Sequence, residues 1–200
     1  MPNVNIRDPS HDKNLPINVC NWVDKPKCIQ INIFLVRKKD GGNRPVINLK
    51  KLNKFLPYHH LKMEGLQSLK YLLDQGDFLC KIDLKDAYFA IPLEKTSRKY
   101  KRFLWEGDLY KFTCLCFSLA CAPQIFTKLL KVPFALLKRL NVRVVIYLDD
   151  MLIFGRSIEE AMQARDTLIF LLQKLGFVLN LEKLQLQPVK TLEFLELNMK

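Results

Sequence analysis

Short apolar runs alternate with polar, turn-forming segments along most of the chain. Residues 29–36 and 46–49 are rich in β-branched and aromatic residues, and they flank the turn-forming segment 39–43. This pattern predicts a β-hairpin. Runs at 101–105 and 109–113 surround Glu-Gly-Asp and predict a second hairpin. The first half of the chain is therefore expected to be rich in antiparallel strands.

Three segments have the spacing of amphipathic helices. Residues 123–140 form the longest, in which Pro133 is expected to introduce a kink. A leucine-rich segment at 65–75 predicts a shorter helix. Ser157 is a candidate N-cap for the third helix, and Gly176 is its expected end. The apolar stripe of this third helix consists of Ala161, Ala164, Leu168, Leu171, Leu172 and Leu175.

The second half of the chain combines these helices with five short apolar runs. The runs predict strands at 78–84, 142–147, 151–154, 177–179 and 192–197. The first four strands and the two longer helices follow one another in the order β-α-β-β-α-β, which is typical of a ferredoxin-like antiparallel sheet with helices on one face. The expected fold class is therefore α+β.

Composition places the chain among globular proteins with one sizeable core. It has 200 residues, of which 49% are hydrophobic. Residues 1–28 are expected to form a polar tail or lead-in, and 29–200 one domain. No apolar run reaches the ~18 residues of a membrane span, and the N-terminus lacks the apolar core of a signal peptide. The six cysteines lack zinc-site spacing and are expected to be reduced core thiols of an intracellular protein, in the nucleus or cytoplasm.

The formal charge of +12 says more about binding partners than the hydrophobic content does. An excess of this size favours a partner rich in phosphate, because each neutralised phosphate releases counterions. A basic soluble protein without such a partner is the plainer alternative.

Three acids stand in unusual surroundings. Asp83 ends the apolar run 78–82, and Asp149 and Asp150 separate two other apolar runs. A carboxylate at the end of a buried strand costs free energy unless it is paired or binds a metal. A tight hairpin that presents two acids beside a third would form an oxygen-rich site of the kind that Mg²⁺ prefers. The plainer alternative is that the two adjacent acids are only a turn.

Two of these segments carry a specific resemblance. Tyr147-Leu148-Asp149-Asp150 resembles the YxDD hairpin of reverse transcriptases, and Lys81–Pro92 resembles that family's first catalytic motif. Further segments resemble, in the family's order, its basic fingers, its template-contacting motif, the motif after the catalytic hairpin and the primer grip, at 38–53, 117–126, 175–183 and 194–195. The resemblance runs from about Ile31 to Leu197 and implies the fingers and palm of a right-hand polymerase. The motif sequences are most similar to those of retrotransposon enzymes of DIRS-like or Gypsy-like type.

The resemblance implies a role for each motif residue. Asp83, Asp149 and Asp150 would hold two Mg²⁺ ions, with Mn²⁺ as an alternative ion, and Lys183 would be a proton donor to the leaving pyrophosphate. The incoming dNTP would meet residues at four positions, namely Lys38, Arg44, Tyr88 and Phe117. Template and primer would contact Lys95, Arg98, Lys99, Lys101, Arg102, Pro123 and Gln124. Tyr88 would exclude a 2′-hydroxyl by its bulk, although a core aromatic is the alternative, and the basic residues could equally be a solvated face.

This chain also departs from the family's pattern. Ser118 and Glu196 stand where the family usually has glycine, and the chain ends at Lys200, directly after the primer-grip motif. We expect no thumb or RNase H region within it, so further regions of a longer polyprotein are expected partners. Binding to a primer–template is therefore expected to exceed extension of it.

Three functions compete on this sequence. The first is an RNA-directed DNA polymerase domain of a retroelement, and the second is a catalytically silent remnant that only binds nucleic acid. The third, a nucleotide cyclase with the same palm topology, should carry a Gly-Gly-Asp/Glu-Glu-Phe type hairpin. The Tyr147–Asp150 sequence argues against it.

Overall fold

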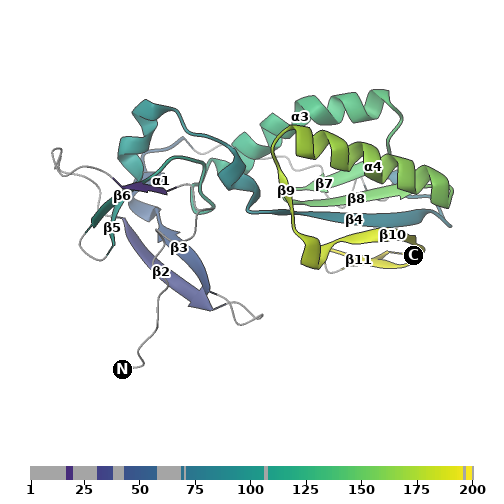
Figure 1. Ribbon diagram of the computed structural model, residues 1–200, viewed down its shortest axis with the longest axis horizontal. Coiled ribbons are helices and arrows are strands. Elements are labelled where there is room, and N and C mark those ends of the chain that lie inside the picture. Colours follow the sequence, from purple (N-terminus) through teal and green to yellow (C-terminus); the bar gives the residue numbers. More distant parts are fainter. Residues whose placement is uncertain are drawn as a thin grey trace. The chain divides into compact units, whose positions relative to one another are not determined.

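The chain folds into two compact units. The first comprises residues 1–56 and 92–119, and the second comprises 57–91 and 120–200, so each unit is built from two separate segments of the chain. The computed structural model describes residues 17–19, 31–37, 43–57, 69, 71–105, 108–195 and 197–199 (Figure 1). Of the helix predicted at 65–75, residues 65–68 and 70 lie outside these residues, and residues 69, 71 and 72 are helical.

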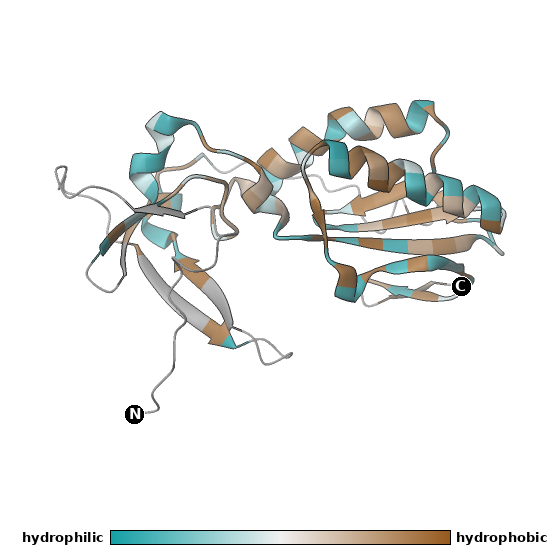
Figure 2. Ribbon diagram, in the orientation of Figure 1, coloured by the Kyte–Doolittle hydropathy of each residue, from teal (hydrophilic) through white to brown (hydrophobic). Residues whose placement is uncertain are grey.

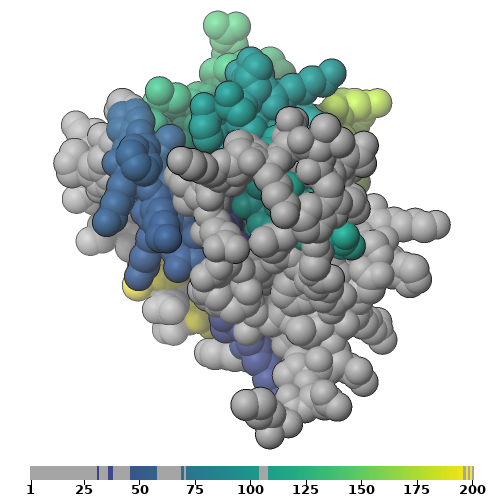
Figure 3. Space-filling view, turned by 90° about the vertical axis from the view of Figure 1, so that its left-hand side faces the viewer, coloured from purple at the N-terminus to yellow at the C-terminus, as the bar shows by residue number. Residues whose placement is uncertain are grey.

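The first unit consists of two small antiparallel sheets. Strands β2 (Asn32–Arg37) and β3 (Asn43–Asn48) form the predicted hairpin, which continues into the short helix α1 (Lys50–Asn53). Residues of β3 and α1 lie at the surface of this unit (Figure 3). The second sheet has the order β1-β6-β5, from strands β1 (Ile17–Val19), β6 (Asp108–Phe112) and β5 (Arg102–Trp105).

Aromatic packing holds the second hairpin of this unit together. Strands β5 and β6 confirm the predicted pair, and the ring of Phe103 lies 5.5 Å from Tyr110 and 5.2 Å from Phe112, between centroids. The segment predicted as a lead-in contributes β1, which pairs with β6 through Ile17 and Val19. A strand of three residues carries too little periodicity to be recognised in a polar segment.

The second unit contains a five-stranded antiparallel sheet of ferredoxin-like order. The order is β10-β4-β8-β7, and the short strand β9 pairs with the end of β4. In chain order its elements are β4 (Phe78–Lys85), α3 (Ala122–Arg139), β7 (Val144–Tyr147), β8 (Asp150–Gly155), α4 (Ile158–Lys174), β9 (Val178–Leu179) and β10 (Gln185–Val189). The predicted β-α-β-β-α-β order and the α+β fold are therefore confirmed, and β10 is an addition that its polar sequence did not predict.

Both long helices cover the same face of this sheet (Figure 1). Ser157 caps α4 by accepting a hydrogen bond from the backbone N–H of Glu160 at 3.1 Å, and Gly176 follows the helix with a left-handed φ of +83°. Along α4, hydrophobic and hydrophilic residues alternate as one buried face requires (Figure 2). Of the predicted stripe, Ala161, Ala164, Leu168 and Leu172 are buried, whereas Leu175 is exposed. Helix α3 runs through Pro133 without ending there.

The other face of the sheet packs against a hairpin. Strands β11 (Leu192–Phe194) and β12 (Leu197–Met199) pair with each other. The prediction of one strand over 192–197 was therefore wrong, because a turn divides it at Leu195, whose φ is +52°. The core on this face contains Leu69, Leu79, Val145, Leu152, Phe154, Phe194 and Met199.

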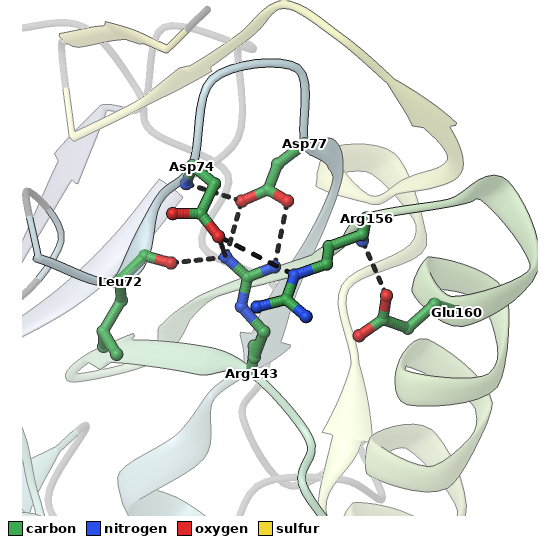
Figure 4. Close-up of polar contacts among 6 residues, drawn as sticks. All are labelled: Leu72, Asp74, Asp77, Arg143, Arg156 and Glu160. Carbon is green, nitrogen blue, oxygen red and sulfur yellow. Dashed lines mark hydrogen bonds and ion pairs between the residues drawn. The ribbon is translucent and has the colours of Figure 1, made fainter.

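A network of ion pairs closes one end of the sheet (Figure 4). Arg143 donates to both carboxylate oxygens of Asp77, at 2.9 and 2.7 Å, and to the carbonyl oxygen of Leu72 at 2.6 Å. Its guanidinium also lies 4.8 Å from the ring centroid of Phe154. Asp74 pairs with Arg143 at 3.3 Å and with Arg156 at 3.8 Å.

The described helices include none that is both long enough and apolar enough to cross a bilayer. Cys80, Cys114 and Cys116 are buried and Cys121 is partly buried, and all four are free thiols. Burial raises the pKa of Cys80 to about 11 and that of Cys114 to about 12, which suits the predicted role of core thiols.

Candidate active site

Sheet register brings the predicted acids to the end of the second unit's sheet opposite to Arg143. Asp83 of β4 lies directly across from Asp150 of β8. Tyr147 pairs with Asp150, so only Leu148 and Asp149 form the turn of the predicted tight hairpin. The backbone N–H of Leu84 donates to the carbonyl oxygen of Asp149 at 3.0 Å. This bond attaches the turn to the end of β4.

The turn has a strained backbone. Leu148 has φ of +56°, a left-handed conformation that costs a residue with a bulky side chain of order 1–3 kcal/mol. A positive φ at the first central residue is characteristic of tight hairpin turns that match the strand twist. The pairing of β7 with β8, and the hydrogen bond from Leu84, therefore offset the cost of this turn and hold it at the end of β4.

Alternation along β4 determines which side chains share the site. Residues two apart on a strand face the same side, so Lys81 and Asp83 share the face of Leu79, which belongs to the core under the β11–β12 hairpin. Cys80 and Ile82 face the other side, where the thiol of Cys80 meets the carbonyl oxygen of Leu186 at 3.4 Å. The candidate site therefore lies on the face of the sheet away from α3 and α4.

The carboxylate of Asp83 is buried, at 3% exposure, and both of its oxygens have partners. The side-chain amide of Asn180 donates to Oδ1 at 2.7 Å, and Nζ of Lys183 lies 3.3 Å from Oδ2. The backbone N–H of Asn180 also donates to the carbonyl oxygen of Asp83 at 2.9 Å. The residues after β9 therefore fix the first predicted metal ligand, and they place Lys183 beside it.

Asp150 has a different environment. Nζ of Lys81 forms an ion pair with its Oδ1 at 3.6 Å. Burial raises the pKa of Asp150, the charge of Lys81 opposes that rise, and the charges of Asp83 and Asp149 add to it. Like charges close enough to raise a pKa show that the three acids share one electrostatic environment.

These residues are chemically suited to a divalent cation. Carboxylate oxygens are the hard ligands that Mg²⁺ prefers, and clustered like charges become favourable when a cation binds between them. Within the described part of the chain, no three acidic, histidine or cysteine side chains stand close enough together to hold an ion as they are placed. A metal site at Asp83, Asp149 and Asp150 therefore stays a prediction.

Tyr88 lies in the short 3₁₀ helix η1 (Ala87–Ala90) and is 7% exposed. Its ring meets the edge of Phe126 with 5.1 Å between centroids. Burial, with the charge of Asp149 as a smaller cause, raises its pKa to about 12. The ring is thus a core residue near the catalytic turn, and its predicted contact with a sugar stays a prediction.

The remaining predicted nucleotide contacts belong to the first unit. Lys38 lies outside the described residues, and for Arg44 only the backbone is described, in β3 opposite Val36. Phe117 is 48% exposed. The carbonyl oxygen of the following Ser118 accepts a hydrogen bond from the side chain of Asn53 at 2.9 Å, which ties this motif to the end of α1.

The predicted template contacts differ in accessibility. Lys95 and Lys99 are exposed in the 3₁₀ helix η2 (Lys95–Lys101), and Arg98 donates from Nε to the carbonyl oxygen of Leu93 at 2.9 Å. Arg102, Pro123 and Gln124 are partly buried, the last two in the first turn of α3. Lys101 is only 5% exposed, because alternation turns it inward where η2 meets β5, and this argues against its predicted phosphate contact.

The sequence does not predict two contacts of the candidate acids. Asn180 belongs to the segment that resembles the motif after the YxDD hairpin, and Lys81 belongs to the segment that resembles the first catalytic motif. The signal for Lys81 was present, since it lies two residues before Asp83 on a predicted strand. For Asn180 only the pairing of β9 with β4 reveals the contact.

Comparison with known proteins identifies the family. Residues 36–199 match the model of the family described as "Reverse transcriptase (RNA-dependent DNA polymerase)". Polyprotein P3 of Commelina yellow mottle virus is 26% identical over 157 residues, which are 78% of this chain and 8% of that polyprotein. The Gag-Pol polyprotein of avian leukosis virus subgroup A is 27% identical over 172 residues, 80% of this chain and 10% of that polyprotein.

Solved structures give the same fold. A foamy viral protease–reverse transcriptase in complex with double-stranded DNA has a TM-score of 0.76 at 23% identity, covering 92% of this chain and 31% of that one. The same type of protein in complex with an RNA/DNA hybrid has a TM-score of 0.72 at 23% identity, covering 85% and 22%. This chain spans 8% of the Commelina virus polyprotein and 20% of a cassava vein mosaic virus polyprotein. The family match covers most of the chain, and the chain therefore belongs to the reverse transcriptase family.

Proposed function

We propose that this chain is the catalytic domain of an RNA-directed DNA polymerase of a retroelement, which adds deoxynucleotides to the 3′-hydroxyl of a primer. One observation carries the proposal. In a chain of the reverse transcriptase family, the register of β4 and β8 sets Asp83 against Asp150, next to the turn that contains Asp149. Three acids at the end of two central strands are the arrangement that nucleotidyl transfer requires.

The acids would bind divalent metal. Two Mg²⁺ ions there would activate the attacking hydroxyl and stabilise the leaving oxygen. Asp83 is prepared for this role because Asn180 fixes one of its oxygens. Burial is the largest cause of the raised pKa of Asp150, and the charges of Asp83 and Asp149 add to it, so a bound cation would offset this smaller contribution.

Lys183 would donate a proton to the leaving pyrophosphate. Its Nζ lies 3.3 Å from Asp83 and its side chain is 61% exposed, so it can turn from the carboxylate toward a leaving pyrophosphate. Tyr88 would lie under the sugar and select deoxynucleotides, and Lys38, Arg44 and Phe117 would contact the nucleotide from the first unit. Arg44 suits a triphosphate because its fork binds phosphate oxygens in pairs.

The primer–template is the proposed partner. The charge of +12 and the exposed Lys95 and Lys99 support contacts with phosphate backbones, which carry little base information. Structural neighbours of similar fold were solved with double-stranded DNA and with an RNA/DNA hybrid. We infer that affinity for a primer–template duplex falls steeply with salt and depends little on sequence.

Primer extension on poly-rA with oligo-dT, dTTP and Mg²⁺ tests the activity. We expect extension by the wild-type chain, none by Asp149→Asn, and unchanged extension by Asp166→Asn. Asp166 is a matched control because it is an exposed acid of α4, whose ion pair with the neighbouring Arg165 is 2.8 Å long. Equal rates for all three proteins would contradict the proposed site.

A catalytically silent remnant is the alternative outcome. It would bind primer–template with the same salt dependence and extend nothing, even at high enzyme concentration. Gly substitutions at Ser118 and Glu196 separate it from a weak enzyme, because they remove side chains where the family usually has glycine. Extension that appears only in the double variant would locate the weakness in those two positions.

A further inference from the structure

Lys81 lies between two functional elements of the second unit. Its Nζ is 3.6 Å from Oδ1 of Asp150 and 5.9 Å from the ring centroid of Phe194. Phe194 is fully buried and begins the segment that resembles the primer grip. The lysine thus joins the catalytic hairpin to the β11–β12 hairpin through one ammonium group.

The two lysines at this end of the sheet differ in freedom. The side chain of Lys81 is 22% exposed, whereas that of Lys183 is 61% exposed. Lys183 comes from a short 3₁₀ helix, η3 (Leu181–Lys183), while Lys81 comes from the centre of β4. When an ion or substrate arrives, Lys183 can leave Asp83 by rotating into solvent, but Lys81 remains beside Asp150.

We propose that Lys81 is a positioning residue that holds the Asp150 carboxylate in place and neutralises its charge, so that Asp83 and Asp149 bear the metal. This inference rests on the proposed function and deepens it, because it assigns metal binding to Asp83 and Asp149 and an ion pair with Lys81 to Asp150. The geometry supports it, since Lys81 Nζ contacts both the Asp150 carboxylate and the Phe194 ring, and its side chain is only 22% exposed.

The proposal predicts a split between metal affinity and turnover. Lys81→Met removes one positive charge a few ångströms from the metal site, so divalent ions should bind more tightly, by about 5-fold at near-aqueous screening. The same variant frees Asp150 to move, so the rate constant for primer extension should fall about 10-fold or more. A purely structural lysine would instead weaken metal binding and turnover together.

Two matched variants control the measurement. Lys81→Arg keeps the charge and should retain the metal affinity of the wild type. Lys190→Met removes a lysine that also stacks on a ring, at 5.3 Å from the centroid of Phe78, next to the opposite end of the same sheet. It changes the net charge equally and should leave both readouts unchanged.

The experiment is a Mn²⁺ titration followed by electron paramagnetic resonance, with single-turnover primer extension on the same proteins. Tighter Mn²⁺ binding with slower extension in Lys81→Met, absent from Lys190→Met, is the expected result. Weaker or unchanged Mn²⁺ binding in Lys81→Met would overturn the proposal. The Mn²⁺ readout stands even if the wild-type chain extends no primer, so it fails separately from the proposed activity.

A second variant guards against misfolding of Lys81→Met. In an Asp150→Asn background the lysine has no carboxylate to hold, so adding Lys81→Met should slow extension no further. An additional loss in this double variant would show that Lys81 acts through another group, and would overturn the proposal by a route that does not need the single variant.

Discussion

The two ends of the second unit's sheet both gather charges, but they hold them differently. At the Arg143 end, a guanidinium binds Asp77 with two parallel hydrogen bonds, and Asp77 has only 2% of its side chain exposed (Figure 4). At the catalytic end, Asp83 and Asp150 each meet one lysine, at 3.3 and 3.6 Å. The Arg143 end is therefore held by a guanidinium with two parallel hydrogen bonds, whereas each lysine at the other end makes one contact with its carboxylate.

The two clusters differ in how easily their contacts can be displaced. A planar guanidinium matched to a carboxylate is the most geometrically specific ion pair in proteins, so the Arg143 end is suited to hold three chain segments together. Lysine is a compact point charge on a flexible stem, and Lys183, at 61% exposure, can turn away from Asp83 into solvent. Its contact with Asp83 is therefore easier to displace than the paired hydrogen bonds between Arg143 and Asp77.

The same substitution at the two ends should separate activity from stability. Asp83→Asn removes a proposed metal ligand and should slow primer extension on the order of 10³-fold or more, with little effect on unfolding. Asp77→Asn should leave extension per folded molecule unchanged. Single-turnover rates, divided by the folded fraction from circular dichroism, measure both variants. Loss of activity in the two variants alike would remove the distinction between the ends.

Arg143→Met should produce the largest loss of stability. It leaves the buried carboxylate of Asp77 without its charge partner, and breaking a buried pair in this way costs about 3 kcal/mol. Chemical denaturation should show this loss, and the double variant with Asp77→Asn should recover part of it. A double variant as unstable as the sum of the two single variants would mean that the two side chains act independently.

Gly155→Ala tests how tightly the Arg143 end is packed. A Cβ at Gly155 would clash with the backbone nitrogen of Ala161 and lie 2.9 Å from its Cα, so β8 and α4 must separate. Overpacking of this kind costs about 1–3 kcal/mol. The midpoint of thermal unfolding should fall, while Mn²⁺ affinity at the far end stays unchanged. An unchanged midpoint would show that α4 can shift freely.

The catalytic end was easier to predict from the sequence than the Arg143 end. The strands were predicted from apolar runs that end in acids. The sheet and the turn at Asp149 were predicted from the order of the elements and motifs. The partners of the acids were harder, because Asn180 reaches Asp83 only through the pairing of β9 with β4. Contacts between residues about 100 positions apart leave no trace in local periodicity.

The Arg143 cluster had no signal at all in the sequence. Asp74, Asp77 and Arg143 look like loop charges in a chain with many charges, and only the fold brings the two loops together. The division of 192–197 into two strands was missed for a related reason. A turn that begins with a left-handed leucine, as Leu195 does, carries none of the glycine or asparagine signals by which such turns are recognised.

The smallest expected effect is the contribution of the Asp150 carboxyl group to the stability of the fold as the pH changes. Asp150 has a raised pKa in the folded protein, chiefly because it is buried. The folded state therefore binds its proton more tightly than the unfolded state, whose carboxyl titrates near pH 4. Stability from this group is present at low pH and is lost as the pH rises from about 4 through the folded pKa.

Asp150→Asn removes that penalty, so in EDTA it should be more stable than the wild type at pH 7 and closer to it at pH 4. The neutral amide costs less to bury than the carboxylate, even though it loses the ion pair with Lys81, whose side chain is 22% exposed. Asp77→Asn should have the opposite sign, since there the charge is matched by Arg143. Urea denaturation of both variants across this pH range measures the contrast. If Asp150→Asn were destabilising throughout, the Lys81 pair would stabilise the fold as the Arg143 pair does, and the two ends of the sheet would no longer differ in kind.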